Sequence, residues 1–409
     1  MHPNERSRHT GIVTIVASSR ALLGGLGVGT AGATALGAAA QWLLRDLSGL
    51  MAGLLVGAAA GDDLDARAKQ WRMTADVLND LAMLLELATS LLPAYAFGPA
   101  VLVASAARAV VGVTAGATKA ALTAHFAQRG NAADVAAKEG AQETAANLVG
   151  MLAGWMLLHW TEGSVCRAWT AFLALTVVHV WANERAMRAL CLRSFNRYRL
   201  DYAVEGYLNA GAAPSPREAN AAEPLLGALP PLRALCSATG FARPAAVVRL
   251  GARLAEIEGL GDCIRVVAPC GKAYAVGVRR LDDARRAEGI AVLPQGASRA
   301  LQLAAYVHAR LAASALAEVL QSAAFQRRAP VESCEGAALA AASQFMRRSG
   351  DPHATAHSRR SYEGLARALA EAGWDLRAVK LRAASWRAVW ATDLLASDTA
   401  PGTAPHGTS

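Results

Sequence analysis

The stretch that decides the fold reads LSGLMAGLLVGAAAG and extends from Leu47 to Gly61. It contains no charged residue and carries a glycine at every fourth position: Gly49, Gly53, Gly57 and Gly61. Residues four apart lie on one face of a helix, where small side chains let two helix backbones approach closely. An interior glycine weakens a helix by about 0.5–1 kcal/mol relative to alanine, so this repetition needs a packing reason. The stripe therefore predicts a helix–helix contact.

Other uncharged runs flank this stretch at Ala21–Leu44, Leu87–Ala107, Thr144–Thr161 and Ala168–Asn183. A helix that crosses a bilayer needs about 20 predominantly apolar residues, so three of the five runs are long enough and two are marginal. Tryptophans lie within or beside the last two runs, as they do at membrane interfaces. We therefore predict membrane insertion. The alternative is an alanine-rich soluble bundle, because alanine and glycine are only weakly hydrophobic.

The composition supports the same interpretation. Of the 409 residues 54% are hydrophobic and 18% are charged, with a mean hydropathy of +0.24. Such a chain has enough apolar surface to fold, which excludes disorder for most of it. The net charge of +9 comes with arginine pairs scattered along the C-terminal half, and no motif that reads bases accompanies them. The pattern is typical of a solvated surface, and we predict no nucleic-acid partner.

The character of the sequence changes after about residue 210. We expect a mainly α protein, with a multi-helix membrane domain followed by a small α+β C-terminal domain. The short apolar pieces Cys263–Val267, Ala273–Val278 and Ile290–Leu293 predict strands, and Arg299–Gln326, Ser361–Ala372 and 374–390 predict helices. The expected organisation is an N-terminal segment (1–20), a membrane domain (21–210), a linker (211–225), an α+β domain (226–395) and a disordered tail (396–409).

Two polar stripes lie between the apolar runs. On a helix, Asp76, Asn79, Asp80 and Glu86 fall on the side opposite a row of leucines. Ionisable groups next to membrane helices usually face a bundle interior or a water-filled cavity. Asp134, Lys138 and Gln142 align in the second stripe, with Glu139 and Glu143 beside them, and His179 and Asn183 form an i, i+4 pair farther on. The predicted ligand-binding residues are Asp76, Asn79, Asp80, Asp134, Lys138, Gln142 and Glu143. The alternative is a surface helix at the level of the lipid headgroups.

Motifs with known chemistry are otherwise missing from the sequence. The glycines of Gly27–Gly32 match G-x-G-x-x-G but lie within an apolar run, which favours helix packing over dinucleotide binding. His353 and His357 lack a third ligand, so we predict no metal site. The sequence offers no nucleophile–base pair, no catalytic residue and no identifiable cofactor.

Several segments carry a family likeness. Gln41–Asp46, Ala68–Asp80, Gln142–Thr144 and Glu223–Leu225 resemble the root UV-B sensitive family, as do Gly130, Asn131, Asp134 and Lys138. The resemblance implies a membrane protein, located in plants at the plastid or another organelle. It further implies roles in UV-B response, seedling development, auxin transport and pyridoxal-phosphate homeostasis. Its expected partners are membrane lipid and either another family member or a second copy of the chain.

Two functions remain open at this point. The chain could be a carrier whose polar stripes line a path for a small charged solute. It could instead be a membrane-anchored scaffold that binds a partner protein through its C-terminal domain. An enzyme ranks third, because no nucleophile–base or metal constellation is visible in the sequence.

Overall fold

The computed structural model describes residues 35–127, 129–226, 245–258, 263–267, 273–281, 286–321, 331–347, 361–381, 383 and 387. The expected N-terminal segment (1–20), the glycines of Gly27–Gly32, the pair His353 and His357, and the tail (396–409) lie outside these residues. Two compact units form. The first comprises Met1–Leu192 and Asn220–Phe241, and the second comprises Arg193–Ala219 and Ala242–Ser409.

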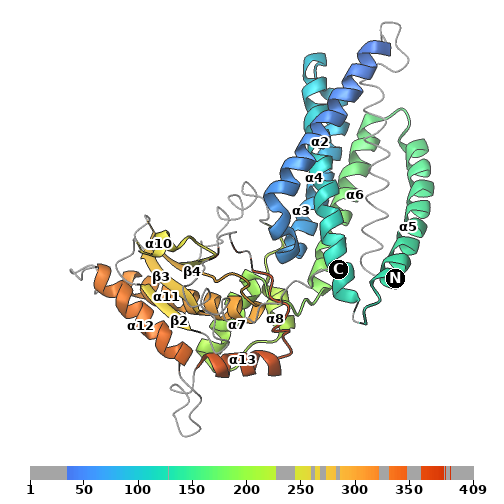
Figure 1. Cartoon of the computed structure of the whole chain (residues 1–409). Helices are drawn as coiled ribbons and strands as arrows, with labels where there is room; N and C mark the ends of the chain where they lie inside the picture. The colour runs from blue at the N-terminus through green and yellow to red at the C-terminus, as the bar shows by residue number, and fades with distance from the viewer. Residues whose placement is uncertain are drawn as a thin grey trace, which may run out of the picture. The chain divides into compact units, whose positions relative to one another are not determined.

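The first unit is built from long helices (Figure 1). They are α2 (Ala35–Ala66), α3 (Ala68–Ala88), α4 (Ala94–Phe126), α5 (Ala132–Thr161) and α6 (Val165–Ala189), with the 3-10 turn η1 (Thr89–Leu91) between α3 and α4. Helix α4 packs against both α2 and α3, and α3 also packs against α6. Helix α2 continues through Arg45 and Asp46, which separate two of the uncharged runs in the sequence.

The uncharged run Leu87–Ala107 does not form one helix. It is interrupted by η1 and by Pro93. Pro93 is the N-cap residue of α4, a position that does not require the backbone N–H group that proline lacks. Helix α4 then continues past Arg108 and Lys119 to Phe126. Both cations have carboxylate partners, Glu86 and Glu143, so their charge does not end the apolar helix.

The glycine stripe of α2 lies partly against α4. A Cβ atom on Gly49 would lie 3.3 Å from Ser105 Oγ and 3.7 Å from Ala109 Cβ, and one on Gly53 would lie 3.5 Å from Val113 Cγ2. A Cβ atom on Gly57 would meet no atom within 4 Å. The surroundings of Gly61 are outside the described residues. The close approach therefore concerns the N-terminal end of the stripe.

A four-stranded sheet organises the second unit. The strands β1 (Ala246–Leu250), β2 (Cys263–Val267), β3 (Ala273–Arg280) and β4 (Ala287–Val292) are ordered β1-β4-β3-β2, with β1 parallel to β4 and the other pairs antiparallel. Alternate residues of β3 enter different clusters: Tyr274 and Val276 pack with α11 (Arg299–Gln321), whereas Ala273 and Ala275 pack with Ile257 of α10 (Leu254–Glu258). The two helices therefore cover opposite faces of the sheet.

Four further helices complete this description: α7 (Arg197–Ala210), α8 (Pro216–Ala222), α12 (Val331–Arg347) and α13 (Tyr362–Glu371). The expected class, mainly α with a small C-terminal α+β part, is confirmed. Strand β1 was not predicted. Helix α7 belongs to the second unit, because its residues Leu200, Ala203 and Val204 are buried in the core of that unit.

The prediction of a helix over 374–390 is wrong for the residues that the structure describes there. Backbone groups of this segment pair with Phe195 instead: Phe195 N donates to Ala378 O at 2.9 Å, and Lys380 N donates to Phe195 O at 2.8 Å. The ring of Trp374 stacks on that of Phe195, with centroids 4.6 Å apart. The contacts with Phe195 therefore outweigh the local sequence pattern that favours a helix over 374–390.

Three helices in the described residues are long and apolar enough to cross a membrane: α4 from Tyr95 onward, α6 and α11. Helix α11 belongs to the core of the second unit, because its residues Leu303, Val307 and Leu316 are buried against the sheet and its covering helices. The length and composition of a helix do not distinguish a buried core helix from a membrane span. The candidates in the first unit are therefore α4 and α6.

The stripe yields a matched pair of variants. Gly49→Leu should lower the thermal midpoint of unfolding in detergent, because even its Cβ is tightly placed and overpacking typically costs about 1–3 kcal/mol. Gly57→Leu should leave the midpoint unchanged or raise it, since the space around it is open and leucine favours a helix. Equal midpoints for the two variants would contradict this packing.

Candidate functional site

Charged residues lie every fourth position on one face of α3. Arg72, Asp76 and Asp80 follow one another at successive turns, so their side chains can reach the same neighbours. Arg72 Nε donates a hydrogen bond to Asp76 Oδ2 at 3.2 Å. Asn79 is half-buried on the same helix. This row of charged side chains lies in the interior of the first unit, because α3 packs against α4 and α6.

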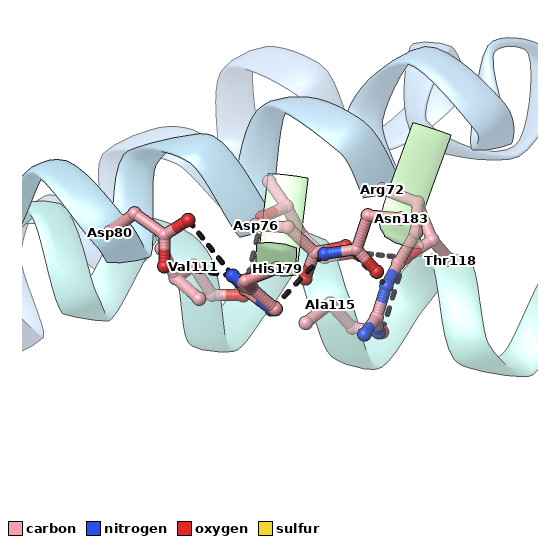
Figure 2. A network of polar contacts seen from close by, with 9 residues as sticks. Arg72, Asp76, Asp80, Val111, Ala115, Thr118, His179 and Asn183 are labelled. Atoms are coloured by element: carbon pink, nitrogen blue, oxygen red, sulfur yellow. Dashed lines mark hydrogen bonds and ion pairs between the residues drawn. The ribbon is translucent and has the colours of Figure 1, made fainter. Parts of the chain in front are cut away.

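Two residues of α6 complete a buried chain of hydrogen bonds, which Figure 2 shows. His179 Nδ1 lies 2.9 and 2.8 Å from the two carboxylate oxygens of Asp80, and His179 Nε2 lies 3.1 Å from Asn183 Nδ2. The exposed fractions are 4% for Asp80, 6% for His179 and 2% for Asn183. We call Arg72, Asp76, Asp80, His179 and Asn183 the polar cluster.

Two threonine hydroxyls of α4 donate hydrogen bonds to backbone carbonyl oxygens of their own helix. Thr114 Oγ1 donates to Val110 O at 2.8 Å, and Thr118 Oγ1 donates to Thr114 O at 2.7 Å. A threonine hydroxyl that donates to the carbonyl oxygen four residues earlier uses its one proton within its own helix. The ionisable side chains of the polar cluster belong to α3 and α6.

A second buried ion pair lies farther along α3. Glu86 is 2% exposed and accepts a hydrogen bond from Arg108 Nε at 2.8 Å. Met83, Leu87 and Phe172 form an apolar cluster, and Met83 lies between Asp80 and Glu86 in the α3 sequence. An apolar layer thus separates the ion pair from the polar cluster.

The structure does not bring the predicted α5 residues to the polar cluster. Asp134, Lys138 and Gln142 are exposed on α5. Glu143 Oε2 accepts a hydrogen bond from Lys119 Nζ of α4 at 2.6 Å. Of the seven predicted ligand-binding residues, Asp76 and Asp80 lie in the cluster and Asn79 lies beside them on α3. A ligand-binding role for the α5 residues stays a prediction.

His179 and Asn183 were visible in the sequence as a polar i, i+4 pair at the end of an apolar run, but they were not selected as site residues. Lys69 was missed entirely. It is 1% exposed, and its Nζ donates to Leu190 O at 2.9 Å and to Asn220 Oδ1 at 3.2 Å. These contacts hold the start of α3 to the segments that follow α6, so the role of Lys69 is to close one end of the first unit. No spacing in the sequence joins residues 69 and 220.

Metal binding finds no support in the described part of the chain, where no three His, Cys, Asp or Glu side chains gather closely enough to hold an ion. The polar cluster has two carboxylates, one imidazole and one guanidinium. This set can bind and release protons, and it can hold a small charged or hydrogen-bonding molecule.

We expect Asp80→Ala to lower the free energy of unfolding by about 1–3 kcal/mol, because it leaves the buried His179 ring without an acceptor. Gln142→Ala, at an exposed position on α5, should change it by less than about 0.5 kcal/mol. Thermal unfolding of both variants in detergent measures the difference. Indistinguishable midpoints would show that the hydrogen bond between Asp80 and His179 contributes nothing to stability.

Comparison with known proteins relates residues 6–211 to the family model described as the vitamin B6 photo-protection and homoeostasis domain. The chain is 38% identical over 293 residues to Protein root UVB sensitive 3 of Arabidopsis thaliana, covering 71% of this chain and 65% of the relative. It is 41% identical over 218 residues to RUS family member 1 of Dictyostelium discoideum, covering 52% and 41%.

Protein root UVB sensitive 2, chloroplastic, of Arabidopsis thaliana is 32% identical over 191 residues, which are 46% of this chain and 42% of the relative. Each of these matches spans less than two thirds of the relative's own length. No solved structure matches the chain significantly. The family model covers half of the chain and includes every residue of the polar cluster. The chain belongs to the root UVB sensitive family.

Proposed function

We propose that the chain inserts in a membrane through its first unit and carries a small charged solute of vitamin B6 chemistry. The polar cluster is the observation that carries this proposal. Buried ionisable groups inside a membrane bundle are energetically expensive, and they commonly mark the path of a solute or ion. The description of the family domain, vitamin B6 homoeostasis, supplies the solute class.

The surface of the first unit supports insertion. Large apolar side chains face outward on several helices, for example Leu54 (70% exposed) on α2, Trp155 (68%) on α5 and Val177 (69%) on α6. Soluble monomers rarely expose apolar patches larger than a few hundred Å². Surrounding lipid would remove this surface from water.

The length of α6 also suits a bilayer. Arg167 lies over the ring of Trp160 at 5.9 Å, and Arg185 lies over that of Trp181 at 5.6 Å. Arginine and tryptophan favour the two membrane–water interfaces. At 1.5 Å per residue the segment between Arg167 and Glu184 is about 26 Å long, close to the thickness of the hydrocarbon core.

Alkaline carbonate washing tests insertion. We expect the protein to stay in the membrane pellet, because the apolar faces of α2, α5 and α6 would be exposed to water on release. Immunodetection of pellet and supernatant is the measurement. Recovery in the supernatant would exclude insertion.

Uptake by proteoliposomes tests the carrier role. Vesicles containing the purified protein should accumulate at least one of pyridoxine, pyridoxamine and pyridoxal 5′-phosphate above empty vesicles. Asp80→Asn should reduce the initial rate at least about tenfold, which corresponds to 1.4 kcal/mol. Glu162→Gln, in the exposed α5–α6 turn, is the matched control and should retain the rate.

Failure to take up any of the three compounds would reject the carrier proposal. The scaffold function then becomes the stronger one, and co-purification of a stoichiometric partner with the second unit would support it. The α5 prediction is tested in the same vesicles by Lys138→Met. An unchanged rate would remove that row of residues from the solute path.

A further inference from the structure

A fully buried histidine connects three elements of the second unit. His308 belongs to α11 and is 0% exposed. Its Nδ1 atom lies 3.3 Å from the hydroxyl oxygen of Tyr274 on β3, and its Nε2 atom lies 3.0 Å from the hydroxyl oxygen of Ser343 on α12. The imidazole is therefore hydrogen-bonded on one side to the sheet and on the other side to α12.

These hydrogen bonds suit the neutral form of the ring. A neutral imidazole has one N–H group and one unprotonated nitrogen, and a hydroxyl group can either donate or accept. Tyr274 and Ser343 can therefore satisfy both nitrogens in either tautomer. In the protonated ring both nitrogens donate, and two hydroxyl groups can accept these bonds but cannot neutralise the added charge. A buried charge that nothing neutralises is costly.

The described carboxylates of the neighbouring elements do not supply a counter-charge to the ring. Asp201 of α7 accepts a hydrogen bond from an arginine of α11, and Glu288 of β4 is paired with an arginine of β3. Glu363 of α13 is exposed. Glu335 of α12 lies two turns, or about 12 Å, before the serine that meets the ring. Neither hydrogen-bond partner of His308 is a carboxylate.

The cations and phenols around the ring also disfavour its protonation. Arg347, at the end of α12, repels a positive charge on the imidazole. Arg249 and Arg279 alternate along their strands with residues that pack against α11, so they lie on the other face of the sheet. Burial raises the pKa of Tyr274 and that of Tyr362, so both phenols are neutral at physiological pH.

Small side chains make up much of the buried face of α12. Its buried apolar residues in the core of the second unit are Ala338, Leu339 and Ala342, whereas Phe345 and Met346 stay partly exposed. Burial of an alanine methyl group stabilises much less than burial of a leucine side chain, because the free energy follows the apolar area removed from water. The hydrogen bond to the buried imidazole is therefore a sizeable part of the contact that holds α12 in place.

We propose that His308 is an acid-sensitive switch, in which protonation of the imidazole releases α12 from α11 and β3. In the attached state the ring is buried and neutral. In the released state it reaches water and takes up a proton. Release uncovers the parts of α11 and β3 that α12 covers, and a return to neutral pH restores both hydrogen bonds.

The pH window follows from the pKa of His308 in the two states. Burial, with a further effect of Arg347, lowers the pKa of the attached ring to about 4, whereas a solvated histidine has a pKa of about 6.5. Above about pH 6.5 neither state is protonated, and the attachment is most stable. Between these two values only the released state binds the proton, so the equilibrium constant for release rises as the pH falls. At pH 5 it should be about 25 times larger than at pH 7.5.

Hydrogen–deuterium exchange of the purified full chain, measured by mass spectrometry, tests this release. After correction for the intrinsic effect of pH on amide exchange, the protection of the α12 amides should fall about 25-fold between pH 7.5 and pH 5. Amides of β4, which α12 does not hold, should lose much less protection. Unchanged protection of α12, or an equal loss in β4, would overturn the proposal.

Two variants identify the responsible group. His308→Gln keeps an amide that can bond to hydroxyl groups but cannot be protonated in this range, so the protection of α12 should stay constant with pH. His159→Gln, at an exposed position on α5, is the control and should show the same fall as the unchanged chain. A fall in His308→Gln as large as in the unchanged chain would refute the role of His308.

The unchanged chain provides a measurement that does not depend on the folding of a variant. Deuterium exchange at carbon 2 of the imidazole reports the titration of each histidine in the same samples. We expect the midpoint for His308 to lie below about 6.5, because the attached ring resists protonation. A midpoint at or above this value would show that the ring is not held neutral by burial, and the switch would then be excluded.

Discussion

The first unit depends on how charge is buried between α3, α4 and α6. Asp80 meets His179, and Glu86 meets Arg108, beside an apolar cluster formed by Met83, Leu87 and Phe172. A buried charge without a partner would cost several kcal/mol, so each acid fixes the position of the neighbouring helix that supplies its partner. Apolar contacts alone would allow these smooth, alanine-rich helices to slide or rotate against one another.

The same constraint explains why α4 and α6 differ from α5. Helix α6 carries the buried His179, which meets Asp80, and α4 carries the partly buried Arg108, which meets Glu86. Helix α5 instead exposes its charged first half and, in its second half, large apolar residues such as Trp155. Its charged half is joined to α4 through Glu143 and Lys119.

The second unit shows a different use of buried polar groups. His308 is fully buried between Tyr274, whose hydroxyl is 3.3 Å from Nδ1, and Ser343, whose hydroxyl is 3.0 Å from Nε2. Burial lowers the pKa of His308 to about 4, so the ring is neutral at physiological pH. No carboxylate is among these two partners, in contrast to Asp80 beside His179. Both rings are buried, and of the two only His179 lies against a carboxylate in the contacts described.

The sequence by itself determined the mainly helical character of the first unit, the α+β character of the second and the family, because apolar periodicity, turn residues and long motifs are local. It also located Asp76 and Asp80, since a polar row on one helix face is visible in the spacing. Only the tertiary structure decided that His179 and Asn183 complete the polar cluster, that Asp134, Lys138 and Gln142 lie outside this cluster, and that α11 is a core helix. These outcomes depend on which helix faces meet, and residues 99 positions apart leave no joint pattern in one sequence.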